Sequence, residues 1–208
     1  MKRTYLSKMF FLAILPAVMV MSAYKPAGTG YAVGDKVADF NLKNVTGINV
    51  SLSGLKDNKG AIVVFTCNHC PFSVAYEDRI IALHKKYASQ GFPVVAINPN
   101  DAGKVPEDSF EAMKTRAKEK QFPFVYLQDA TQEVAKAFGA ARTPHVFILS
   151  RNGSDYKVEY IGAIDNNTDE PSAATEKYVE KAMDELIAGK KVTTNFTKAI
   201  GCTVKWKS

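Results

Sequence analysis

Cysteine, histidine and tryptophan are scarce in this chain of 208 residues, which holds three cysteines, three histidines and one tryptophan. A structural zinc site takes roughly four cysteine or histidine ligands, so this set offers little material for one. The charge-free stretch at residues 9–23 is shorter than the roughly 20 residues of a membrane-spanning helix. The fractions of 46% hydrophobic and 23% charged residues exclude disorder, collagen-like repeats and a multi-span membrane protein.

Acidic residues are absent from both ends of the chain. Residues 1–23 carry three basic residues and residues 189–208 carry five, whereas the body between them has 19 basic and 21 acidic residues. The net charge of +6 therefore belongs to the ends. No stripe of basic and aromatic residues runs through the body, so we expect no nucleic-acid partner.

The first 23 residues have the organisation of an export signal peptide. Three basic residues precede the charge-free stretch, which Pro16 interrupts and which the small residues Ser22 and Ala23 close. We therefore predict a signal at residues 1–23 and a location in the bacterial periplasm or cell envelope. An uncleaved single anchor is the alternative. Otherwise we expect membrane contact only transiently, through the signal or the basic tail.

The rest of the chain is predicted to form one domain at residues 24–191 and a basic tail at residues 192–208. The tail contains Cys202 and Trp206. Two interpretations of it stay open: a solvated tail, or a segment that packs back on the body.

Strands and helices are predicted to alternate along the body. Continuous apolar runs are typical of strands buried on both faces, and spacings of three and four are typical of helices. The pattern predicts a mixed α/β sheet with helices on both faces. The expected strands are 37–42, 48–52, 61–65, 93–97, 124–127, 145–149 and 158–161, and the expected helices are 76–87, 109–120, 131–138 and 172–188.

The chemistry is predicted to lie where a buried strand leads into a helix through Cys67-Asn68-His69-Cys70-Pro71. Unpaired N–H groups at a helix N-terminus favour an anion, and the thiolate is the reactive form of cysteine. Cys67 is predicted to attack a substrate disulfide and Cys70 to resolve the mixed disulfide. The reverse reaction would oxidise dithiols.

Other functions of the two cysteines can be weighed. Covalent haem attachment needs a histidine directly after the second cysteine, where this chain has Pro71. A metal-binding module that uses Cys67 and Cys70, with zinc or copper, stays open, as does a non-catalytic partner-binding domain. A purely structural disulfide across four residues would close little chain entropy.

Four segments carry a resemblance to a known family. Residues 33–40, 67–71, 96–102 and 201–206, which read VGDKVADF, CNHCP, AINPNDA and GCTVKW, are similar to the thioredoxin-fold redoxins. The similarity is to their peroxiredoxin-like (AhpC/TSA-type) branch with a CxxC motif, and it spans about residues 33–188.

The resemblance implies a fold, an activity and a site. The fold would be a thioredoxin-like three-layer sandwich with a mixed central sheet. The activity would be that of a thiol–disulfide oxidoreductase in redox homeostasis. It would act on protein or small-molecule thiols and disulfides, and a redox partner would recycle it without a cofactor or a metal. Thr143-Pro144 would be the family's cis-proline turn, packed against the CxxC, where a substrate peptide can pair as an added strand.

Two departures from the family limit this inference. Peroxiredoxins carry Pro-x-x-x-Thr-x-x-Cys, but the corresponding places before Cys67 hold Gly60 and Val64. A thiol peroxidase with antioxidant activity is therefore the alternative. Thioredoxin has a tryptophan before its first cysteine, where this chain has Thr66.

The remaining candidates are His69 and Cys202. Two residues separate the cysteines of the CxxC motif. His69, the second of them, resembles the residue at that place in strongly oxidising periplasmic oxidoreductases, so we expect it to stabilise the Cys67 thiolate. The reduction potential would then be more oxidising than thioredoxin's roughly −270 mV. Cys202 is the odd cysteine of a predicted exported protein, which suggests a third redox role, intermolecular pairing or a buried unreactive thiol.

Overall fold

The computed structural model describes residues 30–208, and the predicted export signal lies outside them. In the described part, no helix combines the length and the apolar character needed to cross a membrane. The strands are β1 (Lys36–Val37), β2 (Asn41–Asn44), β3 (Asn49–Ser51), β4 (Gly60–Phe65), β5 (Val94–Asn98), β6 (Val125–Gln128), β7 (Arg142–Thr143), β8 (His145–Asn152), β9 (Asp155–Gly162) and β10 (Cys202–Thr203). The α-helices are α1 (Pro71–Tyr87), α2 (Phe110–Glu119), α3 (Glu133–Phe138) and α4 (Tyr178–Ile187).

Eight of these strands form one mixed sheet in the order β1-β9-β8-β4-β5-β6-β2-β3. Strands β4, β5 and β6 run parallel, because α1 and α2 supply the crossovers between them. Strand β8 runs antiparallel to β4, and β9 antiparallel to β8. Every residue of β4 is buried, as its apolar sequence predicts for a central strand covered on both faces.

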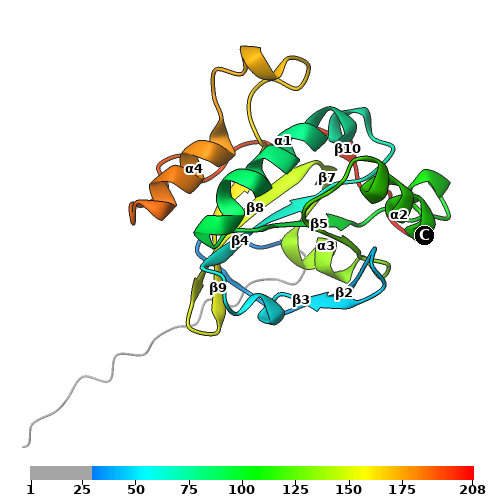
Figure 1. Cartoon of the computed structure of the whole chain (residues 1–208), viewed down its shortest axis with the longest axis horizontal. Coiled ribbons are helices and arrows are strands. Elements are labelled where there is room, and N and C mark those ends of the chain that lie inside the picture. The colour runs from blue at the N-terminus through cyan, green and yellow to red at the C-terminus, as the bar shows by residue number, and fades with distance from the viewer. Residues whose placement is uncertain (1–29) are drawn as a thin grey trace, which may run out of the picture.

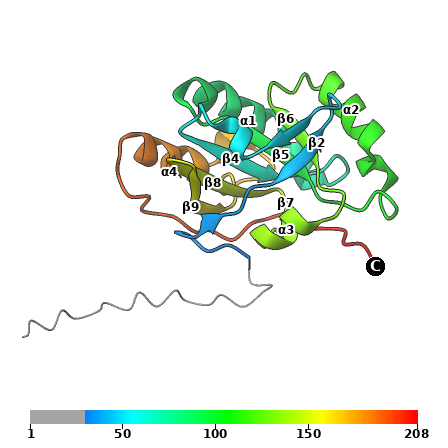
Figure 2. The ribbon, with the colours of Figure 1, turned by 90° about the horizontal axis from the view of Figure 1, so that it is seen from below.

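Helices cover both faces of the sheet, which confirms the predicted three-layer sandwich. Helices α1 and α4 lie over one face and α3 lies against the other (Figure 1). Tyr76, Ile80 and Leu83 of α1 pack with Val179 and Met183 of α4 on the first face. The C-terminal segment, red in Figure 2, runs from α4 past β9 to the region of β7.

Glycines end several elements where the sequence predicts. Gly91 follows α1 and its short 3-10 extension with φ +92°, and Gly139 follows α3 with φ +71°. A positive φ is inexpensive only for glycine. Ser109 begins α2 by accepting the Ala112 N–H in its side chain, as an N-cap serine does.

Two predicted boundaries are wrong. Helix α4 begins at Tyr178, not at Ser172, which lies in a separate 3-10 turn. The loop before α4 is instead held to α1, because the Arg79 guanidinium donates to the carbonyl groups of Asn167 and Thr168. The first predicted strand is also split: β1 pairs with β9, and only β2 forms the hairpin with β3. The domain boundary at residue 191 stays a prediction.

Gly60 begins β4 at a place without room for a side chain. A Cβ there would overlap the Leu149 carbonyl oxygen of β8 and the ring of Phe92. We expect Gly60→Ala to lower the free energy of unfolding by about 3 kcal/mol, since backbone cannot yield as a flexible side chain does. Urea denaturation measures this, with Gly103→Ala as the control because its Cβ would meet only ordinary contacts. Equal midpoints for the two variants would contradict the expectation.

Candidate active site

The first two cysteines lie where β4 leads into α1, as predicted. Cys67 follows two residues after the end of β4, and Cys70 is the N-cap of α1 with Pro71 in its first turn. Proline suits that position because its missing N–H would have no helical partner. Both cysteines are buried: Cys67 is 2% exposed and Cys70 is fully covered.

The predicted Thr143-Pro144 turn lies directly against Cys67, and its peptide bond is cis, as the family resemblance implied. The Cys67 Sγ is 3.2 Å from the Thr143 Oγ1 and 3.7 Å from the Ser73 Oγ. Cys67 is the free cysteine among the described residues.

The disulfide differs from the expected one. The structure joins Cys70 to Cys202, with a Cα–Cα separation of 6.1 Å, and leaves Cys67 reduced. The reason is the docked tail: β10 pairs antiparallel with β7, and the register places Cys202 opposite Thr143. The interpretation of the tail as a solvated extension is therefore wrong, and the packed alternative is confirmed.

The surroundings of Cys67 shift the pKa of its thiol upward, whereas the sequence predicts a stabilised thiolate and hence a downward shift. Burial raises the pKa of the Cys67 thiol, and the negative charge of Asp108 raises it further. The hydrogen bonds that Cys67 makes with the Thr143 hydroxyl, the Cys70 N–H and the Ser73 hydroxyl oppose this rise only in part. In this disulfide state the helix N-terminus therefore does not yield a stabilised thiolate. A reduction potential more oxidising than thioredoxin's stays a prediction, and a stabilised Cys67 thiolate does not support it.

His69 is held by a buried carboxylate that the sequence analysis missed. The His69 Nδ1 donates to the Asp108 Oδ2 at 2.6 Å, and Asp108 is completely buried. Asp108 also accepts from the Asn68 N–H at 2.7 Å and from the side-chain amides of Asn98 and Asn100 at 3.2 and 2.8 Å. Because a buried carboxylate is costly without donors, these contacts fix the position of the CxxC loop.

This hydrogen-bonded group continues to β6. The Tyr126 hydroxyl donates to the Asn68 Oδ1 at 2.9 Å, and the Asn98 amide donates to the Tyr126 oxygen at 3.3 Å. Burial raises the pKa of Tyr126 well above its ordinary value, so the phenol stays protonated and remains a donor. Asn68, the residue after the first cysteine, is thus anchored by Tyr126 of β6 and by Asp108, and both of these accept from the Asn98 amide of β5.

Cys67, His69 and Asp108 are also the residues that would meet a metal ion, since one ligand atom from each lies within 4.8 Å of the others. Each oxygen of Asp108, however, already accepts two hydrogen bonds. The Cys70 sulfur is bound to Cys202 and cannot also act as a thiolate ligand. In this redox state the contacts favour a loop fixed by hydrogen bonds over a metal centre.

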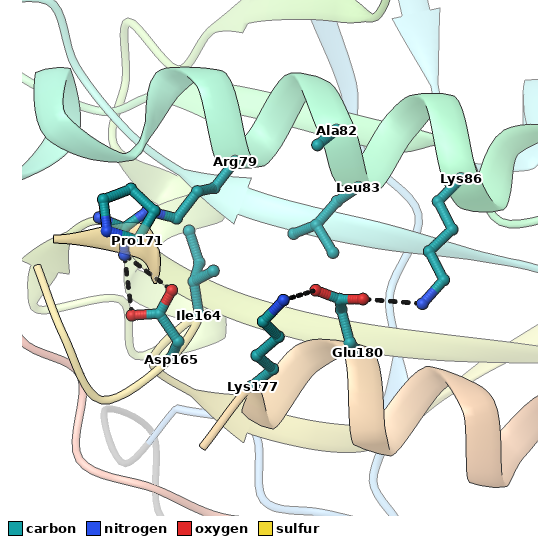
Figure 3. A pocket seen from close by; sticks show the side chains of 9 residues that line it. All are labelled: Arg79, Ala82, Leu83, Lys86, Ile164, Asp165, Pro171, Lys177 and Glu180. Carbon is teal, nitrogen blue, oxygen red and sulfur yellow. Dashed lines mark hydrogen bonds and ion pairs between the residues drawn. The ribbon is translucent and has the colours of Figure 1, made fainter. Parts of the chain in front are cut away.

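A cavity of about 190 Å³ lies between α1, α4 and the loop before α4 (Figure 3). Its charged groups are paired with one another. Arg79 binds Asp165 at 2.7 Å, Lys86 binds Glu180 at 2.7 Å, and Lys177 lies 3.7 Å from Glu180. The cavity therefore presents no unpaired charge to a ligand, and its ion pairs hold the loop and α4 onto α1.

Known proteins resemble the chain in sequence and structure. Residues 32–177 match the family model named Redoxin. A conserved uncharacterised protein from Geobacillus kaustophilus is 39% identical, with a TM-score of 0.78 over 85% of this chain and 93% of that one. A hypothetical protein from Sinorhizobium meliloti is 35% identical, with a TM-score of 0.77 over 86% and 97%.

A more distant solved structure has the same fold. It is a peroxidoxin from Mycobacterium tuberculosis, 23% identical, with a TM-score of 0.55 over 75% of this chain and 94% of that chain. Among curated proteins, none matches. The family match spans more than half of the chain, so this protein belongs to the redoxin family and is an oxidoreductase of the thioredoxin-like fold.

Proposed function

We propose that the protein is an exported thiol–disulfide oxidoreductase that acts in redox homeostasis, with Cys67 as the nucleophile and Cys70 as the resolving cysteine. The single observation that carries this proposal is the contact between the Cys67 Sγ and the Thr143 Oγ1. The free thiol of Cys67 lies at the junction of β4 and α1, beside a cis-proline turn.

The groups around Cys67 suit a thiol that acts as the nucleophile in thiol–disulfide exchange. Its sulfur accepts the N–H of Cys70, and Cys70 begins the same helix. The Cys70 Sγ lies 3.3 Å from the Thr143 carbonyl oxygen, where a Cys70 thiol can donate. Thr143 therefore contacts both sulfurs, and it can hold them for the formation and release of a mixed disulfide.

Export and a location in the periplasm or cell envelope are part of the proposal. The support is the pattern of residues 1–23, in which basic residues precede a charge-free stretch that ends in small residues. An oxidising compartment would allow the disulfide to persist. The partners would be protein or small-molecule thiols and disulfides, together with a redox protein that recycles the cysteines.

A trapping experiment tests the assignment of Cys67. In Cys70→Ser the mixed disulfide cannot be resolved by residue 70, so we expect substrate proteins to accumulate covalently on Cys67 in the native compartment. Mass spectrometry of the trapped species identifies both the substrate and the attachment site. Trypsin places Cys67 on the peptide 60–79 and Cys202 on 199–205, so the two sites are separable. Adducts found only on 199–205 would refute the proposal.

The same preparations separate the two alternative functions. A thiol peroxidase would consume hydrogen peroxide far faster than a free thiol does, although the peroxide-binding motif is missing. A metal-binding module would retain zinc or copper after purification under reducing conditions, and metal analysis of the reduced protein detects this. We expect neither result: the peroxide-binding motif is replaced by Gly60 and Val64, and Asp108 is already saturated with hydrogen bonds that a metal would have to displace.

A further inference from the structure

The C-terminal tail occupies the strand position beside the cis-proline turn. Strand β10 pairs with β7 in the register Cys202 with Thr143 and Thr203 with Arg142. The Val204 N–H donates to the Ala141 carbonyl at 3.1 Å and extends this pairing. An extended segment paired with a strand edge is the usual form of a peptide bound by strand addition.

Beyond this pairing, further hydrogen bonds join the body to the tail's backbone. The Lys205 carbonyl accepts the Asp101 N–H at 2.9 Å and the Gln132 side-chain amide at 2.9 Å, and the Gln132 oxygen accepts the Lys207 N–H at 2.8 Å. Side chains of the tail add to this hold, since Val204 is buried and Trp206 packs against the core. Together these contacts hold Cys202 beside Thr143.

The three cysteines differ in their access to solvent. Cys67 and Cys70 are buried, whereas Cys202 is partly exposed. Cys70 lies between the other two: its N–H binds the Cys67 sulfur, and its own sulfur is bonded to Cys202. A reductant in solution therefore reaches the Cys70–Cys202 disulfide most directly at Cys202.

We propose that Cys202 is a third redox cysteine, which accepts the disulfide from the Cys67–Cys70 pair and presents it to the recycling reductant. This inference rests on the proposed function, because it takes Cys67 as the nucleophile and Cys70 as the resolving residue. The recycling reductant is a dithiol, and it attacks the sulfur of Cys202.

The steps balance without any further oxidant. Cys67 thiolate attacks the substrate disulfide, and Cys70 then displaces the substrate to form Cys67–Cys70, so that the substrate leaves as two thiols. Cys202 thiolate next attacks the Cys70 sulfur: the Cys70–Cys202 bond forms, the Cys67–Cys70 bond breaks, and Cys67 takes up the proton that Cys202 lost. This last step is an exchange with no net oxidation.

Recycling returns the three thiols. One thiolate of the dithiol reductant attacks the Cys202 sulfur, and Cys70 leaves and takes up a proton. The second thiol of the reductant then frees Cys202 and closes the reductant's own disulfide. The described structure, with Cys67 reduced and Cys70 joined to Cys202, is the state that awaits this reductant.

Disulfide mapping over time tests the order of these steps. The reduced full-length protein is mixed with one equivalent of oxidised glutathione, quenched with acid, alkylated with N-ethylmaleimide and digested with trypsin. We expect an internal disulfide within peptide 60–79 first, followed by a cross-link between 60–79 and 199–205 that leaves Cys67 alkylated. A Cys202 that is alkylated at all times would overturn the inference.

We call the transfer of the disulfide from Cys67–Cys70 to Cys70–Cys202 a relay. Two variants and a control distinguish this relay from a purely structural Cys70–Cys202 disulfide. In Cys67→Ser, a relay predicts that the Cys70–Cys202 cross-link forms at least about tenfold more slowly than in the wild type, whereas a structural disulfide forms at the same rate. In Gly201→Ala the new Cβ would overlap the Thr143 carbonyl oxygen, so oxidation should stop at Cys67–Cys70 although all three cysteines remain. Gly103→Ala, with ordinary contacts, should match the wild type.

The outcomes distinguish this inference from the proposed function. A wild-type rate of cross-linking in Cys67→Ser, or an unaltered cross-link in Gly201→Ala, would overturn the relay and leave Cys67 as the nucleophile. Disulfide reduction that persists in Cys67→Ser would instead refute the proposed function itself.

Discussion

Replacing Cys67 with serine should lower the rate of disulfide reduction by about a thousandfold or more, because a serine hydroxyl cannot form the mixed disulfide. The fold should survive. Serine is close in volume to cysteine, and its hydroxyl can keep the hydrogen bonds that link residue 67 to Thr143 and Ser73. We expect the free energy of unfolding to change by no more than about 1 kcal/mol.

Reduction of insulin disulfides, with a small dithiol as electron donor, measures this loss of activity. Circular dichroism and urea denaturation measure the fold in parallel, and Cys67→Ala provides a second variant without a polar atom at the position. Turnover near the wild-type rate in either folded variant would show that Cys67 is not the nucleophile.

Replacing Asp108 with asparagine should make Cys67 more reactive and the protein less stable. The charge of Asp108 raises the pKa of Cys67, so its removal lowers that pKa, and each unit gives about tenfold more thiolate at neutral pH. Asparagine also replaces one carboxylate oxygen with a donor, which would face the donating amide of either Asn98 or Asn100. The free energy of unfolding should fall by about 2–4 kcal/mol.

The pH dependence of alkylation tests the sign of this effect. In the oxidised protein Cys67 is the free thiol of the described chain, so iodoacetamide reports on it selectively. We expect the rate to rise with pH in the wild type with a midpoint above the ordinary value of a thiol, and the midpoint to move lower in Asp108→Asn. Asp57→Asn, an exposed loop residue, is the matched control. An upward or absent shift would show that Asp108 does not act on Cys67.

Much of the fold follows from local patterns in the sequence. The apolar run of β4 is buried along its whole length, and the spacing of Tyr76, Ile80 and Leu83 matches the buried face of α1. The glycines after α1 and α3 are local signals as well, because only glycine takes a positive φ cheaply. The position of the two CxxC cysteines between strand and helix follows from the same local rules.

The rest depends on contacts between distant parts of the chain. Asp108 lies 39 residues beyond His69 and follows no motif, so only the folded structure shows that it organises the loop. The Cys70–Cys202 pair spans 132 residues, and sequence alone does not fix such a connectivity. The reversed effect on the Cys67 pKa has the same origin, since desolvation depends on the tertiary structure that covers the thiol.

Cys70 and Cys202, which the disulfide joins, belong to parts of the molecule that differ in how readily they unfold locally. Cys70 begins a helix packed on β4, the fourth of eight strands, and amides in such a core exchange with solvent only when the whole domain unfolds. Cys202 belongs to a separate sheet of two short strands, which can open locally. Once the sulfur–sulfur bond is broken, the tail can therefore leave and return many times while the core that carries Cys70 stays folded.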